Sequence, residues 1–272
     1  MEKLAIIGGG AMGGALVAGL LAADAVAAAD VVVAEPHPGR AADVAEANGV
    51  ATTPSAAEAC TGADVVLLAV KPQVLEEVCE QLGPALGDDA LVISIIAGIP
   101  TAKLESLLAL RKGRRVVRMM PNTAALVGAA VTAVAPGAFA LDDDVEIAAR
   151  IAAAVGTVVR VEEAALDAVT AVSGSGPAYV FVVAEALTDG AVSMGLSRDV
   201  ATTLVHQTLA GAAALLVESG RSPADLRAQV TSPAGTTAAG LGVLERRAVR
   251  AAFADAVVAA TERSVELGRP PA

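Results

Sequence analysis

The chain contains almost no aromatic side chains. It has no Trp, one Tyr and three Phe among 272 residues, although 55% of its residues are hydrophobic. Ala, Val and Leu must therefore fill the core of the one or two domains that a chain of this length forms. Because small side chains allow helices to approach closely, we expect part of the stability to come from packing between subunits.

Cysteine and basic residues are also scarce. The two cysteines, Cys60 and Cys79, have neither the spacing of a metal site nor a nearby His, so we interpret them as ordinary reduced thiols. With 30 acidic against 19 basic residues the net charge is -11, which disfavours nucleic acid as a partner. The basic run Arg111–Arg115 is short and typical of a solvated loop.

Long apolar runs without a charge are missing as well. A membrane helix needs about 20 such residues, and the most apolar early run, GGALVAGLLAADAVAAADVVVA, is interrupted by Asp24 and Asp30. The opening residues MEKLAIIGGG contain neither the basic region nor the cleavage site of a signal peptide. We therefore expect a cytoplasmic protein that does not bind membranes.

Short apolar runs alternate with helical patterns in residues 1–162. Runs typical of strands are Leu4–Ile7, Val31–Glu35, Val65–Val70, Leu91–Ile95, Val116–Met119, Val131–Ala135 and Thr157–Val161. The helical patterns between them are Ala11–Ala23, Val74–Gln81, Ala102–Leu110 and Asp142–Ala154. This alternation predicts an α/β domain whose doubly wound, mainly parallel sheet has helices on both faces.

Strand patterns nearly disappear after Val161. The segments that follow are helical and rich in Ala, Val and Leu: Ala178–Met194, Arg198–Glu218, Ala224–Gln229 and Arg246–Leu267. They predict a second, all-helical domain, residues 163–272. The first of these helices is apolar nearly all round over its first half, and such a helix must be covered on most sides. We therefore predict a homodimer, or a larger assembly of dimers, built through this domain.

A glycine-rich turn follows the first expected strand. In LAIIGGGAMGGAL, Gly8, Gly10 and Gly13 have G-x-G-x-x-G spacing between a strand and a helix, the context that dinucleotide binding requires. Gly8 permits the tight turn, Gly10 lets the main chain approach a pyrophosphate, and Gly13 lets the helix pack against the strand. The motif predicts a Rossmann-type domain, with a merely flexible glycine turn as the alternative.

The end of the second expected strand, VVVAEPHPGR, bears on the choice of dinucleotide. Glu35 follows Gly13 at the spacing of an acid that binds the ribose 2′-hydroxyl, and its charge would repel a 2′-phosphate. This position favours NADH. His37 and Arg40 follow closely, however, and would neutralise such a phosphate. The sequence leaves both NADPH and NADH open.

Two helix starts are rich in Gly and hydroxyl side chains: SGSGP, before Ala178, and SPAGTT, before Ala238. Helix N-termini with exposed N–H groups suit a carboxylate, and a hydroxyl such as that of Thr237 can hold a proton toward a ligand. Plain N-capping by Ser232, Thr236 and Thr237 is the alternative, and the residues alone favour it.

Six stretches, taken together and in this order, resemble the pyrroline-5-carboxylate reductase family: GGGAMGGAL, LLAVKPQ, SIIAGI, RMMPNT, DAVTAVSGSGPAYVF and VTSPAGTTAAGLGVLE. The resemblance implies an N-terminal Rossmann domain and a C-terminal all-helical dimerisation domain. It also implies reduction of 1-pyrroline-5-carboxylate to L-proline, the last step of proline biosynthesis, generally with NADPH and sometimes with NADH. Many members have a small hydroxyl residue where this chain has Glu35, so the resemblance leaves its cofactor preference open.

The resemblance further implies which residues form the site. Thr237 would be the catalytic donor to the substrate nitrogen, Gly235 and Thr236 would offer N–H groups to the substrate carboxylate, and Ser173 is a further substrate-binding candidate. The implied cofactor-binding residues are Ile7, Gly8, Gly9, Gly10, Ala11, Met12, Gly13, Glu35, Ala69, Val70, Lys71, Pro72, Ile95, Ile96 and Ala97. No metal is implied.

Other interpretations remain open. Lys71 either lies along the cofactor or only ends a strand, and Asn122, in the turn after Pro121, either orients a ligand or simply forms the turn. A relative of the β-hydroxyacid dehydrogenases would share the architecture, but it commonly needs a Lys on a C-terminal helix, and no Lys follows Val161. A dinucleotide sensor or scaffold without turnover is the alternative from outside the enzymes.

Overall fold

The computed structural model describes residues 3–108 and 113–268. The chain divides into two compact units. The first unit comprises residues 1–175 together with 259–272, and the second comprises residues 176–258. The end of the helix expected at Ala102–Leu110 and part of the expected basic loop Arg111–Arg115 lie outside the described residues.

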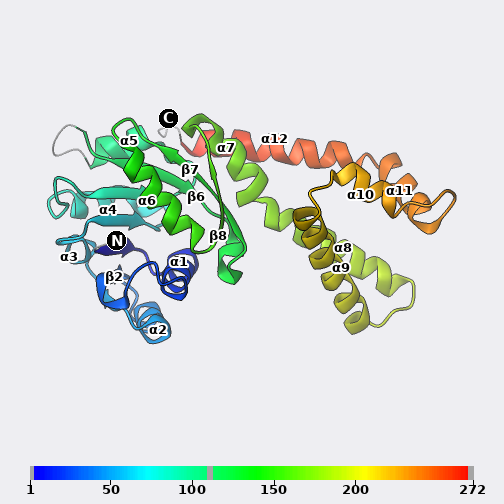
Figure 1. Ribbon diagram of the computed structural model, residues 1–272, viewed down its shortest axis with the longest axis horizontal. Helices are drawn as coiled ribbons and strands as arrows, with labels where there is room; N and C mark the ends of the chain where they lie inside the picture. Colours follow the sequence, from blue (N-terminus) through cyan, green and yellow to red (C-terminus); the bar gives the residue numbers. More distant parts are fainter. Residues whose placement is uncertain (1–2, 109–112, 269–272) are drawn as a thin grey trace. The chain divides into compact units, whose positions relative to one another are not determined.

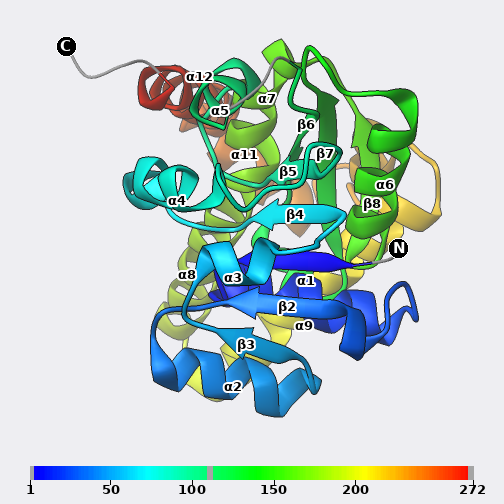
Figure 2. The ribbon, with the colours of Figure 1, turned by 90° about the vertical axis from the view of Figure 1, so that its left-hand side faces the viewer.

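The first unit contains an eight-stranded sheet in the described part of the chain, with strand order β3-β2-β1-β4-β5-β6-β7-β8. Neighbouring strands are parallel except β6 and β7, which are antiparallel. Figure 2 shows the strands from β3 upward through β2, β1 and β4. The strands are β1 (Leu4–Ile7), β2 (Val31–Ala34), β3 (Ala51–Thr53), β4 (Val65–Leu68), β5 (Leu91–Ser94), β6 (Val116–Met120), β7 (Ala130–Pro136) and β8 (Gly156–Arg160). The mainly parallel sheet predicted from the sequence is confirmed.

The strands are apolar on both sides, which explains their continuous hydrophobic runs. In β1, Leu4 and Ile6 join one hydrophobic cluster, whereas Ala5 and Ile7 join another on the opposite face. A parallel sheet is stable only when both faces are covered. The helices of this unit are α1 (Ala11–Ala22), α2 (Pro38–Asn48), α3 (Ala56–Cys60), α4 (Leu75–Leu82), α5 (Thr101–Leu107), α6 (Asp142–Ala153) and α7 (Leu166–Val169).

Short helical turns connect several of these elements. The 3₁₀ turns are η1 (Ala28–Asp30), η2 (Pro72–Val74), η3 (Thr123–Val127) and η4 (Glu163–Ala165), and the π-helical turn is η5 (Thr170–Gly174). The chain order changes direction across the sheet between β1 and β4. Ligands of open α/β sheets bind at such a point, beyond the carboxyl ends of the strands.

The second unit consists of helices. They are α8 (Gly176–Ser193), α9 (Arg198–Glu218), α10 (Pro223–Gln229), α11 (Thr236–Arg246) and the first part of α12 (Val249–Leu267). In the single chain, α8 buries only Thr188, and α9 buries only Ala201 and Val205. Phe181 and Val182, both on α8, are each 62% exposed. These helices therefore lack the cover that their composition requires.

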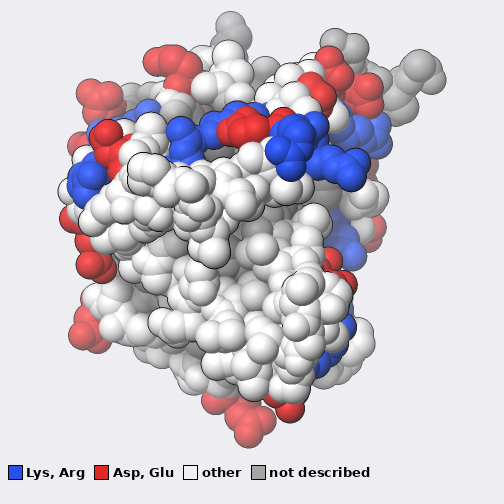
Figure 3. All heavy atoms as spheres, turned by 90° about the vertical axis from the view of Figure 1, so that its right-hand side faces the viewer, with Lys and Arg blue, Asp and Glu red and all other residues white. Residues whose placement is uncertain are grey.

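Uncharged side chains dominate the face shown in Figure 3, where Lys, Arg, Asp and Glu gather in a band along the upper part and at the rim. By length and composition alone, two helical stretches, Glu163–Ser193 and Arg198–Glu218, are apolar enough to cross a membrane. Only 11% of each apolar window is buried in the single chain. Their exposed apolar surface needs a partner of some kind.

Helix α12 belongs to both units, because the boundary between them falls after Val258. Its last residues pack on the first unit, and in Figure 1 its C-terminal end lies beside α5 and α7. A Cβ at Gly98, in the loop after β5, would lie 3.0 Å from the Cβ of Leu267. The first unit is therefore completed by residues from the far end of the chain.

Candidate functional site

The glycine loop between β1 and α1 has two glycines that the fold itself requires. Gly8 has φ +111°, and a Cβ there would lie 2.5 Å from the carbonyl oxygen of Ala69. A Cβ at Gly13 would lie 2.0 Å from the carbonyl oxygen of Gly8. Both distances are too short for any side chain. These residues bring the loop, α1 and the end of β4 together.

Gly10 differs from these two, since a Cβ there would meet no atom within 4 Å. It is the N-cap of α1, and the structure describes neither a side-chain capping bond there nor an acidic residue in the first turn. Ala11, which follows it, is exposed. Open space in front of a free helix N-terminus suits a phosphate, so the loop fits the pyrophosphate of a dinucleotide.

A cavity of about 690 Å³ extends from this loop along α1. Gly9, Gly10 and Ala11 line it at one end, and Arg40 on α2 and Leu126 on η3 also contribute. The wall along α1 is built from Gly and Ala, whose small side chains leave the space open. The cavity is large enough for part of a dinucleotide.

Glu35, at the end of β2, is 4% exposed and has three donors. Oε1 accepts hydrogen bonds from the N–H of His37 at 2.9 Å and from Nη2 of Arg40 at 2.7 Å, and Oε2 accepts one from the N–H of Gly9 at 3.1 Å. Burial alone would raise the pKa of this carboxyl. The bond from Arg40, the N–H groups and the Arg40 charge outweigh burial, so the pKa lies below its ordinary value.

Arg40 is therefore the group of this pair that a ligand can reach. Its side chain is 54% exposed and lines the cavity, whereas the Glu35 side chain lies behind it. His37 caps α2, where its Nδ1 accepts a hydrogen bond from the N–H of Arg40 at 3.4 Å. Glu35, which favoured NADH in the sequence, and Arg40, which would neutralise a 2′-phosphate, thus form one ion pair at the edge of the cavity.

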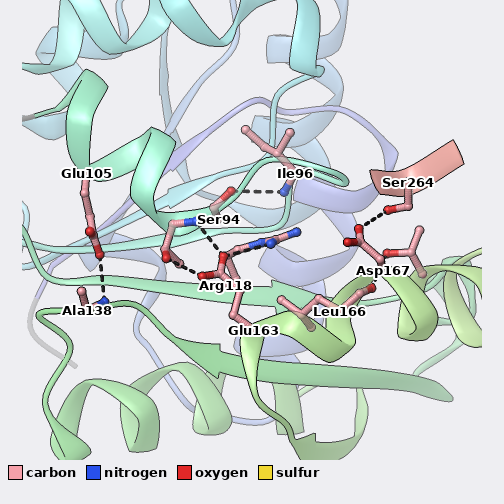
Figure 4. A network of polar contacts seen from close by, with 11 residues as sticks. Ser94, Ile96, Glu105, Arg118, Ala138, Glu163, Leu166, Asp167 and Ser264 are labelled. Carbon is pink, nitrogen blue, oxygen red and sulfur yellow. Dashed lines mark hydrogen bonds and ion pairs between the residues drawn. The ribbon is translucent and has the colours of Figure 1, made fainter. Parts of the chain in front are cut away.

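The other predicted cofactor-binding segments follow β4 and β5 at the same edge of the sheet. Lys71 and Pro72 are exposed, and Ala69, Val70, Ile95 and Ala97 are partly exposed. The side chains of Ile7 and Ile96 are buried in the core, so these two residues offer a ligand only their main chain. The N–H of Ile96 is already bound, since it donates to Oγ of Ser94 at 3.2 Å (Figure 4).

Sequence reasoning missed a polar network around Arg118, in the middle of β6. Nη1 of Arg118 lies 3.0 Å from Oε1 of Glu163. Figure 4 marks this ion pair with a dashed line. The same carboxylate accepts hydrogen bonds from the N–H of Thr101 at 2.7 Å and from its hydroxyl at 2.6 Å. Burial would raise the pKa of Glu163, but the bonds from Thr101 and Arg118 lower it below its ordinary value. A charged residue inside the apolar strand VVRMM was the available signal, because a buried Arg needs a partner.

Ser173 lies in the π-helical turn η5, which packs against the end of β6. Its hydroxyl donates to the carbonyl oxygen of Val169 at 3.0 Å, and it keeps lone pairs for a ligand. A Cβ at Gly174 would lie 2.7 Å from Cε of Met120. Two residues after Met120, Oδ1 of Asn122 is buried without a hydrogen-bond partner in the described structure. Single π turns are frequent at functional sites.

The hydroxyl-rich start of α11 lies in the second unit. Gly235 is its N-cap, and a Cβ there would lie 2.3 Å from Oγ of Ser232. Within the described residues no side chain caps this helix, and its first turn has no acid. Ala234 has φ +57°, so the turn holds a conformation that is unfavourable for Ala. The N-capping alternative for Thr236 and Thr237 is not observed.

Metal and thiol chemistry have little support. Among the described residues, no group of three or more His, Cys, Asp and Glu is arranged to hold a metal ion. Burial raises the pKa of the Cys60 thiol to about 12, and burial with the charge of Glu76 raises that of Cys79 to about 11. Both thiols therefore stay protonated and unreactive.

The two groups of candidate residues thus belong to different units. The glycine loop, Glu35, the segments after β4 and β5, and Ser173 belong to the first unit, whereas Gly235, Thr236 and Thr237 belong to the second. One group suits a dinucleotide and the other suits a small anion.

Comparison with known proteins also distinguishes two parts of the chain. Residues 163–267 match the family described as pyrroline-5-carboxylate reductase dimerisation, and residues 3–98 match the family described as NADP oxidoreductase coenzyme F420-dependent. The chain is 44% identical to pyrroline-5-carboxylate reductase from Methanosarcina acetivorans over 98% of both chains.

Solved structures give the same result. The pyrroline-5-carboxylate reductase of Coxiella burnetii is similar with a TM-score of 0.91 and 37% identity, over 99% of both chains. The pyrroline carboxylate reductase of Plasmodium falciparum, solved with NADP bound, has a TM-score of 0.88 and 31% identity, over 99% of this chain and 100% of that one. Similarity of this extent, in both sequence and structure, shows that the chain belongs to the pyrroline-5-carboxylate reductase family.

Proposed function

We propose that this enzyme reduces the C=N bond of 1-pyrroline-5-carboxylate to give L-proline, the last step of proline biosynthesis, with NADPH or NADH. The observation that carries the proposal is the uncapped start of α11, where N–H groups and two threonine hydroxyls lie together. A small ring with one carboxylate and one imine nitrogen needs these groups and few others. Membership of the family supports this substrate.

The first unit holds the dinucleotide in this proposal. Gly8–Gly13 and the first turn of α1 bind its pyrophosphate, and Glu35 with Arg40 lies at its ribose. Ala69–Pro72 and Ile95–Ala97 line the rest of its path along the sheet edge. When bound, the nicotinamide supplies the hydride.

The second unit holds the substrate. The N–H group of Thr236 binds its carboxylate, because the free N-terminus of α11 carries a partial positive charge. The N–H group of Gly235 donates to the carbonyl oxygen of Ser232 at 3.1 Å in this structure, so it must exchange that bond for one to the carboxylate. The hydroxyl of Thr237 donates to the imine nitrogen. Since a threonine hydroxyl is a weak acid, the proton itself comes from solvent or is already on the imine; in the second case the Thr237 hydroxyl accepts the hydrogen bond from the imine N–H and orients the ring. Ser173 provides a further contact through its free lone pairs.

We also propose a homodimer, or an assembly of such dimers, that acts in the cytoplasm without nucleic acid or membrane partners. The exposed apolar helices α8 and α9 lie inside the region 163–267 that matches the dimerisation family. A second copy is therefore the expected cover for them. The net charge of -11 disfavours nucleic acid. The proposed boundary between cofactor and dimerisation domains lies between residues 162 and 163.

Light scattering tests the assembly. Phe181→Arg, on the exposed face of α8, should convert the dimer to a monomer, because it places a charge in an apolar interface. Phe139→Arg is the matched control, since Phe139 is an exposed aromatic residue of the first unit. A monomeric native protein at micromolar concentration would refute the dimer.

The activity is tested by incubating the protein with 1-pyrroline-5-carboxylate and either NADH or NADPH, and following the absorbance of the reduced nicotinamide. Oxidation of at least one cofactor, matched by formation of proline, is expected. A β-hydroxyacid substrate with the oxidised cofactors is the control for the competing dehydrogenase. No oxidation of either cofactor would refute the proposal.

A further inference from the structure

The loop after β5 is held by the last turn of α12. Gly98 has φ +73°, and a Cβ there would lie 3.0 Å from the Cβ of Leu267 and 3.3 Å from the carbonyl oxygen of Ser264. In the other direction, a Cβ at Gly268 would lie 2.6 Å from the carbonyl oxygen of Gly98. The two segments thus touch main chain to main chain, at a distance that only glycine allows.

A second contact joins the same turn to α7. The hydroxyl of Ser264 donates to Oδ1 of Asp167 at 2.6 Å, and Ser264 is 4% exposed (Figure 4). Asp167 lies in α7, which continues directly into the π turn that holds Ser173. One helical turn therefore contacts both the loop that follows Ile95–Ala97 and the helix that leads to Ser173.

We propose that Ser264, Leu267 and Gly268, the C-terminal clasp, position the cofactor-binding loop and the Ser173 turn with respect to each other. This inference rests on the proposed function. The clasp residues contact Gly98 and Asp167, which are outside the proposed cofactor and substrate sites, so they act through the segments that they hold.

The physical reason lies in the loop itself. Gly98 gives the main chain conformational freedom where the loop borders the proposed cofactor site. Ordering a flexible segment on binding lowers affinity. Contact with α12 orders the loop beforehand. Loss of the clasp should therefore weaken cofactor binding while leaving hydride transfer in the loaded enzyme almost unchanged.

The two sides of the clasp can be removed separately. Ser264→Ala deletes the bond to Asp167, and Gly268→Ala forces the main chain of Gly98 to move. Each variant should raise the Kd and the KM for the cofactor about 5- to 30-fold, which corresponds to the loss of one buried hydrogen bond or contact. At saturating cofactor, kcat should stay within about twofold of the native value.

Two control variants separate this effect from general damage. Glu266→Ala changes an exposed residue in the same turn, and Gly87→Ala adds a Cβ that meets no atom within 4 Å. Both should leave the cofactor Kd unchanged. Binding is measured from the fluorescence of the reduced nicotinamide, and amide hydrogen exchange of residues 96–99 should be faster in the two clasp variants at equal Tm.

The outcomes are decisive. A rise in Kd with faster exchange at residues 96–99 and a nearly constant kcat supports the clasp. Native-like Kd in both clasp variants, or a fall in kcat without a change in Kd, would overturn it. Cofactor binding without turnover of 1-pyrroline-5-carboxylate by the native protein would instead refute the proposed function. The binding and hydrogen-exchange measurements would still test the clasp in that case.

Discussion

Nη2 of Arg40 lies 2.7 Å from Oε1 of Glu35, at the edge of the cavity that begins at the glycine loop. Glu35 is buried behind the pair and Arg40 is its exposed member. Glu35 therefore does not act on the ribose alone, because it is paired with Arg40. A 2′-phosphate can approach this exposed cation.

Cofactor choice should respond in opposite directions to the two members of this pair. Glu35→Ser removes the negative charge and frees Arg40, so the ratio of kcat/KM for NADPH to that for NADH should rise about tenfold. Arg40→Ala should lower the same ratio by a similar factor. Steady-state kinetics with both cofactors measures it, and an equal ratio in all three proteins would show that neither residue lies near the 2′-position.

Two glycines of the loop should differ in what they contribute. Gly10→Ala adds a methyl group to open space, so Tm should hardly change, whereas cofactor Kd should rise at least about tenfold because the methyl occupies the phosphate position.

Gly13→Ala is the contrasting variant. Its Cβ would lie 2.0 Å from the carbonyl oxygen of Gly8, so it should lower stability by about 1–3 kcal/mol, as overpacking does. Thermal unfolding and fluorescence titration distinguish the two. Tight cofactor binding by Gly10→Ala would remove that position from the phosphate site.

The two threonines at the start of α11 should also be separable. Thr237→Ala should lower kcat about ten- to a thousand-fold, because it removes the donor to the imine nitrogen, and cofactor Kd should not change. Thr236→Ala is the matched control, since the proposed contact of Thr236 uses its N–H group. Full activity of Thr237→Ala would exclude it from the mechanism.

Stability should depend on pH through Glu163. Its pKa is lowered in the folded protein, so its contribution is fully present above the unfolded pKa of about 4.3 and is lost as the pH falls through the lower, folded value. Glu163→Gln should lower the free energy of unfolding at pH 7 by about 1–3 kcal/mol.

Denaturant unfolding at a fixed protein concentration should show this difference shrinking as the pH falls from the unfolded pKa of about 4.3 through the lower pKa of the folded protein. Glu146→Gln is the control, because the exposed pair Glu146–Arg160 should contribute less than about 1 kcal/mol. An equal loss at pH 7 and at low pH would show that the charge of Glu163 is not what stabilises the network.

The sequence predicted the sheet wherever strands have long apolar runs. The three-residue strand β3 (Ala51–Thr53) was missed, because it is too short to show a pattern and only Thr53 is buried. Helix α2 was missed for a similar reason, since it buries only Val44. The family prediction from six motifs is confirmed, because motifs of this kind record local geometry at the glycine loop and at the start of α11.

Contacts between distant residues could not be predicted in this way. Arg118 and Glu163 are 45 residues apart, and Ser264 and Asp167 are 97 apart. Glu163 lies at the start of η4, and an acid at such a position is common in surface helices, so it gives no sign of a distant partner. Such pairing is decided by how the elements pack, and no local pattern encodes it.

The split of the first unit between residues 1–175 and 259–272 bears on how the protein is made. During synthesis the nucleotide-binding half emerges early, yet it lacks its closing turn until residues 259–268 have been made as well. Expressing residues 1–162 alone should therefore give a fragment whose β5 loop is uncovered. Residues 259–268 would have to be fused to this fragment for the β5 loop to recover its native rigidity.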